Sequence, residues 1–245
     1  MSTYLSIELR RVWRNRMYLL FTVGFPVVIY LVFSHVGVTN GRIAGTTGNA
    51  YSMVSMAAFG AVSAALFIGT RIAVERRIGW ARQLRLTALS GRDYLTVKVV
   101  VAMLTTLPTI GLVFLAGALT NGVTLPALRW VELVLLLVIG ILPFAALGVA
   151  LGYLVGGDAA QPVITAVYMT LSLLGGLWFP ASLMPSVMRA VAQVLPTYRY
   201  AELGWRTLAG EAPDIQGIGI LAYWGLLFAV AALILYRRAG RRLTA

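Results

Sequence analysis

The sequence predicts an all-α membrane protein with six transmembrane helices in one domain, residues 1–245. Of its 245 residues, 60% are hydrophobic and 11% are charged, whereas a soluble domain carries about a quarter charged residues. Apolar runs of about 20 residues recur along the chain, long enough to cross a bilayer core of about 30 Å. These runs are residues 17–36, 51–70, 99–119, 133–155, 159–179 and 217–236.

The segment before the first run predicts an amphipathic helix in the membrane interface, residues 1–16. Its apolar side chains share one helical face: Leu5, Leu9, Val12 and Trp13. Arginines surround that face. The alternative is a basic topology signal without regular structure. Because the first run has full spanning length and no small-residue cleavage pattern, we expect a retained helix and not a signal peptide.

The distribution of basic residues predicts the orientation of the chain. Fifteen of the 20 Lys and Arg residues lie in the N-terminal segment, in residues 71–98 and at the C-terminus, and five lie on the opposite side. Basic residues collect on the cytoplasmic side, so both termini are expected in the cytoplasm. The net charge of +12 thus comes from basic residues at the ends of the spans, and no nucleic-acid binding is expected.

Glycine and proline inside the apolar runs predict local irregularities. Gly24 with Pro26 interrupts the first run, Pro108 the third, and Gly140 with Pro143 the fourth. Membrane helices tolerate these residues where neighbouring groups satisfy the freed backbone. Kinks are therefore expected in these spans.

The stretch 71–98 is longer than a simple connection between two helices. It interleaves arginines with apolar residues and breaks at Ser90-Gly91. This pattern favours a helix that lies across the cytoplasmic face and presents apolar side chains to a partner. A solvated basic loop held to anionic lipid is the alternative.

Residues 180–216 form an external segment that is punctuated by proline. Pro185 and Pro196 bracket ten residues, about 15 Å of helix, too short to cross the membrane. We expect a pair of short re-entrant helices that cover the external mouth of the bundle. An ordinary external loop is the alternative.

Residues for several kinds of chemistry are missing. There is no cysteine and one histidine, His35, so neither disulfides nor a metal site is expected. The single lysine, Lys98, does not lie in a phosphate-binding loop. All eight acidic residues lie at span ends or in loops, whereas proton-coupled carriers need titratable groups near the bilayer centre. The sequence therefore predicts a membrane path whose energy comes from another molecule.

Two local patterns resemble the permease of an ABC-2 type ABC transporter. One is Glu75-Arg76-Arg77-Ile78-Gly79, which runs into a leucine-rich turn before the third span. Many family members have a proline after the threonine of that turn, where this chain has Ala88. The other is Gly175-Gly176-Leu177-Trp178-Phe179-Pro180 with the later prolines. The resemblance covers nearly the whole chain.

The resemblance implies that a separate ABC ATP-binding subunit hydrolyses ATP with Mg, and that this chain binds no cofactor and is no enzyme. Residues 75–92 would form the coupling segment that contacts this subunit. Its implied contact residues are Glu75, Arg77, Gly79, Leu84, Leu86, Thr87 and Leu89. An external gate is implied at Pro180, Met184, Pro185, Pro196 and Tyr198. A second permease copy would complete the transporter, a homodimer being favoured over a heterodimer.

The resemblance also implies that the second and fifth spans line the substrate path. Polar and flexible side chains recur on them at helical spacing, although ordinary helix packing also uses small and hydroxylated residues. The path residues are expected to be Ser52, Met53, Ser55, Met56, Phe59, Ser63, Thr165, Tyr168, Met169, Ser172, Trp178 and Phe179. Methionine and aromatic side chains suit a hydrophobic or amphiphilic compound, such as a drug, antibiotic or lipid.

The leading hypothesis is therefore a permease subunit for export across the cell membrane. A secondary carrier would need no ATP, and the lack of a mid-membrane acid argues against it. A third hypothesis is an accessory or immunity protein that transports nothing. Transport driven by ATP in vesicles would separate these three.

Overall fold

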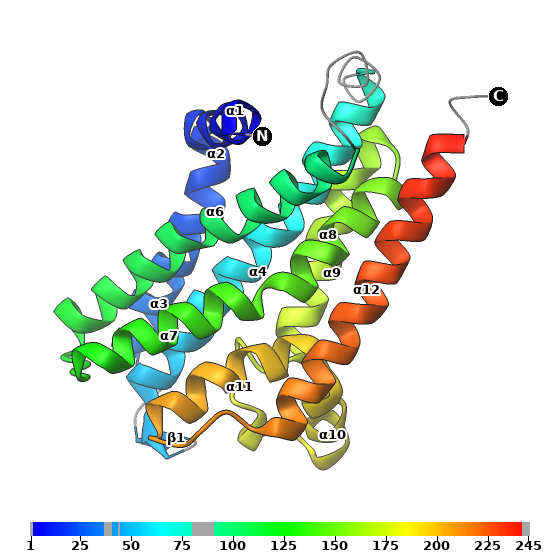
Figure 1. Ribbon diagram of the computed structural model, residues 1–245. Coiled ribbons are helices and arrows are strands. Elements are labelled where there is room, and N and C mark those ends of the chain that lie inside the picture. Colours follow the sequence, from blue (N-terminus) through cyan, green and yellow to red (C-terminus); the bar gives the residue numbers. More distant parts are fainter. Residues whose placement is uncertain (1, 37–40, 44, 80–90, 242–245) are drawn as a thin grey trace.

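The computed structural model describes residues 2–36, 41–43, 45–79 and 91–241, and these are almost entirely helical. The all-α class is confirmed. At one end of the elongated bundle lie α1 (Ser2–Arg14), the last turn of α4 (Gly48–Arg77) and the first turn of α6 (Gly91–Thr120). We call this the α1 end (Figure 1). The opposite end, the α11 end, carries α10 (Ser186–Val194) and α11 (Pro196–Leu208).

The first span is helical but irregular, as the glycine and proline predict. It consists of α2 (Arg16–Leu19), the π-helix η1 (Leu20–Gly24) and α3 (Phe25–Val36). Pro26 has no N–H, so the Thr22 carbonyl loses its helical donor. The Thr109 hydroxyl on α6 donates to that carbonyl at 3.1 Å. A neighbouring helix thereby satisfies the freed backbone group, as membrane-embedded chains require.

Helix α4 forms the centre of the bundle. Every residue from 50 to 66 is buried, and α4 contacts α3, α6, α8 (Leu142–Leu154) and α9 (Ala160–Leu174). Its contact with α8 is built on glycine. A Cβ on Gly148 would lie 2.7 Å from the Ala65 carbonyl oxygen, and one on Gly69 would lie 2.3 Å from the Gly148 oxygen. Small residues at this crossing let the two backbones touch.

The fourth apolar run folds as two helices, α7 (Ala127–Gly140) and α8, with the break at the predicted position. Gly140 and Pro143 flank it. Tyr200 of α11 packs on Gly140, and its hydroxyl donates to the Leu137 carbonyl at 2.9 Å. The break is thus covered by a side chain from the α11 end.

The fifth run, expected as a helix over 159–179, is shorter in the structure. A 3-10 turn, η2 (Gly157–Ala159), leads into α9, which ends at Leu174. Gly176 ends the helix, because it adopts the left-handed conformation with φ 77° and the next N–H, of Leu177, donates back to the Ser172 carbonyl at 3.1 Å. Gly175 leaves room for Thr197, since a Cβ there would lie 2.0 Å from the Thr197 hydroxyl oxygen. That hydroxyl donates to the Leu171 carbonyl at 2.5 Å and caps the helix.

The remaining elements complete the chain. The 3-10 turn η3 (Ala181–Leu183) precedes α10, and α12 (Ile215–Arg241) returns along α8 to the α1 end (Figure 1). A two-stranded antiparallel hairpin, β1 (Arg42–Ile43) and β2 (Thr46–Thr47), precedes α4. The sequence patterns did not predict this hairpin.

Within the described residues, five stretches are long and apolar enough to cross a membrane. They are Arg16–His35, Gly48–Arg77, Gly91–Thr120, Ala127–Leu154 and Ile215–Ala239. Helix α9 has 15 residues, about 22 Å, and runs from the α1 end toward the α11 end (Figure 1). The six-span count therefore stays a prediction that depends on α9.

Replacing Gly148 with alanine should separate α4 from α8. The added Cβ would meet backbone atoms, and overpacking costs about 1–3 kcal/mol. We expect a lower apparent melting temperature of the purified chain in detergent. The control is Gly111→Ala on α6, where a Cβ meets nothing within 4 Å. Equal melting temperatures for the two variants would contradict the close crossing.

Candidate functional site

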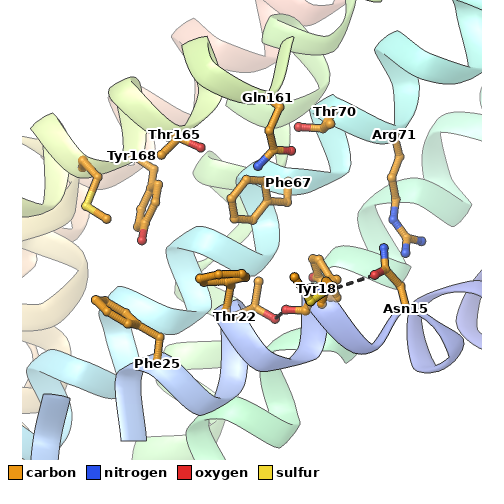
Figure 2. A pocket seen from close by; sticks show the side chains of 13 residues that line it. Asn15, Tyr18, Thr22, Phe25, Phe67, Thr70, Arg71, Gln161, Thr165 and Tyr168 are labelled. Carbon is orange, nitrogen blue, oxygen red and sulfur yellow. Dashed lines mark hydrogen bonds between the residues drawn. The ribbon is translucent and has the colours of Figure 1, made fainter. Parts of the chain in front are cut away.

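A cavity of about 560 Å³ lies between the first span, α4 and α9 (Figure 2). The first span supplies Tyr18, Phe21, Thr22 and Phe25 to its wall. Helix α4 supplies Phe67, Thr70 and Arg71, and α9 supplies Gln161, Thr165, Tyr168 and Met169. Ligand cavities in proteins commonly have volumes of about 300–1,000 Å³, so this one has room for a small organic molecule.

The two ends of the cavity differ in polarity. Arg71 and Asn15 lie together at the α1 end of the cavity, whereas Phe25 and Tyr168 lie at the other end (Figure 2). The Arg71 guanidinium carbon is 5.4 Å from the centre of the Tyr18 ring. The Asn15 side-chain oxygen accepts a hydrogen bond from the Tyr18 backbone N–H at 3.1 Å. The cavity is therefore amphipathic along its length.

Several of the predicted path residues line the cavity or lie directly behind its wall. Thr165, Tyr168 and Met169 line it. The ring of Phe59 packs 5.1 Å from that of Tyr168 and 5.2 Å from that of Trp178. The other α9 residue, Ser172, is buried, and Phe179 is half exposed.

The remaining predicted path residues are buried inside the protomer: Ser52, Met53, Ser55, Met56 and Ser63. The Ser55 hydroxyl donates to the Tyr51 carbonyl at 2.9 Å and accepts from the Trp205 indole N–H at 3.0 Å. The Ser63 hydroxyl donates to the Gly60 carbonyl at 2.8 Å. In the isolated chain these residues pack helices together, and their place in the path stays a prediction.

A buried charge cluster joins three helices at the α1 end. Lys98 Nζ of α6 lies 2.7 Å from Glu8 Oε2 of α1 and 2.6 Å from Glu75 Oε1 of α4. The Tyr94 hydroxyl donates to the other oxygen of Glu75 at 2.6 Å. Lys98 and Glu8 are fully buried, and Glu75 is 6% exposed. Arg11 adds a second cation at the rim of this group. We call these four residues, Glu8, Arg11, Glu75 and Lys98, the charge cluster.

The charge cluster changes the interpretation of α1. Its buried face consists of Tyr4, Glu8 and Val12, which recur every four residues. Trp13, expected on the apolar face, is 57% exposed. Burial above all, and then the carboxylates of Glu75 and Glu8, raises the pKa of Tyr4 above its ordinary range. The phenol thus stays protonated, and the helix packs on protein through a paired carboxylate.

The charge cluster also flanks the predicted coupling segment. Glu75 is the first residue of that segment, and Lys98 follows its end on α6. Arg77 pairs with Asp158 of η2, and Gly79 adopts the left-handed conformation with φ 73°. The other predicted contact residues, Leu84, Leu86, Thr87 and Leu89, lie outside the described residues. Glu75 pairs with Lys98 and Tyr94 within the chain, and its contact with the ATP-binding subunit stays a prediction.

The predicted external gate lies at the α11 end. The Arg189 side chain donates to the carbonyls of Ala181, Ser182 and Met184, which fixes the turn around Pro185. Pro196 begins α11 and is buried, and the Tyr198 ring packs 5.5 Å from that of Trp205. Pro180 is buried as well. The sequence patterns did not predict the hydrogen bonds of Arg189 and Thr197 that hold this region.

The bundle of membrane-length helices and its amphipathic cavity define a multi-pass membrane protein of the permease class. The sequence matches the family described as "ABC-2 family transporter protein" over residues 39–234, and the chain belongs to this family. It is 31% identical over 232 residues to "Putative transport permease YvfS" of Bacillus subtilis (strain 168), and the alignment covers 94% of each protein. The chain is thus a transport permease subunit, which is not an enzyme by itself.

Replacing Lys98 with methionine should destabilise the chain. The change removes the buried cation from two buried carboxylates and leaves them only Arg11 at the rim, and breaking a buried ion pair costs about 3–5 kcal/mol. We expect a clearly lower apparent melting temperature in detergent at neutral pH.

The matched control for Lys98→Met is Glu132→Gln, which breaks the partly exposed Arg129–Glu132 pair. Exposed pairs contribute about 0–1 kcal/mol, so this variant should melt close to the unmodified chain. If both variants lose the same small amount of stability, the charge cluster does not hold the three helices.

Proposed function

We propose that this chain is the membrane-spanning subunit of an ATP-driven ABC exporter. It would move a hydrophobic or amphiphilic compound, such as a drug, antibiotic or lipid, out across the cytoplasmic membrane. The cavity carries this proposal, because its wall combines α4 and α9, the two helices that the resemblance assigns to the substrate path. Aromatic and thioether side chains there suit ligands of varied shape.

The proposed topology has six spans, with α9 as the fifth, and both termini in the cytoplasm. The excess of basic residues on the side of the termini supports it. The α1 end would then face the cytoplasm and the α11 end the outside. Helices α10 and α11 would act as the short external helices, entering the membrane only part way.

The proposed energy source is a separate ABC ATP-binding subunit that holds ATP and Mg. Residues 75–92 would dock on it, with the apolar side chains of Leu84 and Leu86 at the contact. The charge cluster supports this assignment, because it fixes the helices on both sides of the segment. A rigid connection is needed if movement of the partner is to reach the membrane helices.

A second copy of the chain would complete the transporter, and a homodimer is favoured. The sequence of one chain contains both the predicted coupling segment and the predicted external helices, so two identical copies would supply both halves. The stoichiometry of a complex purified with its ATP-binding subunit tests this point.

Replacing Leu84 or Leu86 with glutamate should disrupt the complex with the ATP-binding subunit. A charge forced into an apolar contact costs about 2 kcal/mol or more, so co-purification should fall about tenfold or more. ATP-dependent transport in proteoliposomes should be lost with it. The control is Leu128→Glu, an equally drastic change at an exposed residue near the start of α7.

Intact co-purification and transport in the Leu84 and Leu86 variants would show that the coupling segment is assigned wrongly. Transport that needs a proton or sodium gradient and ignores ATP would instead reject the exporter and favour a secondary carrier.

A further inference from the structure

Arg71 is the charged residue among the described residues that line the cavity. It is half buried on α4, near the α1 end. All eight acidic residues of the chain lie in its described part, and none of the ion pairs found there includes Arg71. The neighbouring arginines Arg76 and Arg77, in contrast, bind the Gly152 and Tyr153 carbonyls and the Asp158 carboxylate.

The contacts of Arg71 do not neutralise its charge. Its guanidinium faces the Tyr18 ring at 5.4 Å, an interaction that contributes about 0.5–1 kcal/mol at exposed sites. Asn15 beside it is an uncharged amide, and so is Gln161, which lies over Phe67 (Figure 2). A partly desolvated guanidinium in a cavity without an acid attracts an anion, and its planar fork matches carboxylate, sulfonate or phosphate.

The rest of the cavity fits an apolar body. Phe67 and Tyr168 face the space away from Arg71, and Phe25 lies beyond them (Figure 2). Aromatic rings stack well on other rings and on alkyl chains. A ligand with its head group on Arg71 would extend along the cavity from the α1 end toward the centre of the bundle.

We propose that the cavity binds an anionic amphiphile, whose head group pairs with Arg71 and whose aromatic or alkyl body lies against Phe67 and Tyr168. Asn15, which lies beside Arg71 (Figure 2), adds hydrogen bonds to the head group. A cationic amphiphile of the same shape is rejected, because its charge would face Arg71. This inference rests on the proposed function and names the substrate class for it.

Binding can be measured without ATP or the partner subunit. The chain is purified in an uncharged detergent and titrated with pyrenebutyrate and with a pyrenebutyl trimethylammonium salt, which share one apolar body. Energy transfer from the six tryptophans to pyrene reports binding, and Trp178 packs against Phe25 of the cavity wall. Pyrenebutyrate should bind about tenfold or more tightly than the cation.

The variants separate charge from shape. Arg71→Gln should lower the affinity for pyrenebutyrate about 10- to 100-fold, the effect expected for loss of charge-assisted hydrogen bonds. Arg71→Lys should lower this affinity less. Tyr168→Ala should lower the affinity for both probes by the same factor. Arg92→Gln, which removes an exposed arginine at the same end, should change neither. Size-exclusion chromatography verifies that each variant is folded.

Equal affinity for the two probes, or unchanged affinity in Arg71→Gln, would overturn the proposal. Repeating the titration in phosphatidylcholine nanodiscs with and without phosphatidylglycerol identifies the source of the anion. Competition by phosphatidylglycerol would assign the site to an anionic lipid, and a lack of competition would assign it to a soluble amphiphile. In both cases the ligand has an anionic head group. Because this assay needs no nucleotide, selective binding without ATP-driven transport would reject the exporter and leave the site standing.

Discussion

The position of α1, α4 and α6 depends on one interaction, the pairing of Lys98 with Glu8 and Glu75. Buried charges are costly unless they are paired at close range, so these three side chains must stay together once the helices have packed. The contact joins residues separated by as many as 90 positions. It lies where the predicted coupling segment leaves α4 and enters α6, so the ends of that segment are held by electrostatics and packing together.

The two sides of α4 differ in the side chains that they carry. Glycine lets α4 and α8 approach until their backbones touch, whereas aromatic rings of the first span, α4 and α9 line the cavity on the other side of α4. Phe67 and Tyr168 form this lining with centroids 6.0 Å apart. The same helix thus supplies the rigid core of the bundle and a wall of its ligand space.

Much of this arrangement could be predicted from the sequence. Periodic apolar runs located the membrane helices, and Gly140 with Pro143 located the break between α7 and α8, because both signals are local. The burial of Glu8 could not be predicted, since its partner is distant in sequence and a glutamate beside arginines on a short helix suggests an exposed face. The end of α9 was missed although Gly176 is a local signal for it, whereas the Thr197 hydroxyl that reaches back to Leu171 comes from a residue distant in sequence.

Arg71 and Glu75 lie four residues apart on α4, about one helical turn. A shift of this turn moves the cavity cation and the buried carboxylate together, so the cavity and the coupling segment share one structural element. Thermodynamic linkage makes such sharing reciprocal. A ligand that displaces this turn would change the affinity of the chain for its partner by the same factor by which the partner changes the affinity for the ligand. A single turn of α4 would then transmit the occupancy of the cavity to the coupling segment.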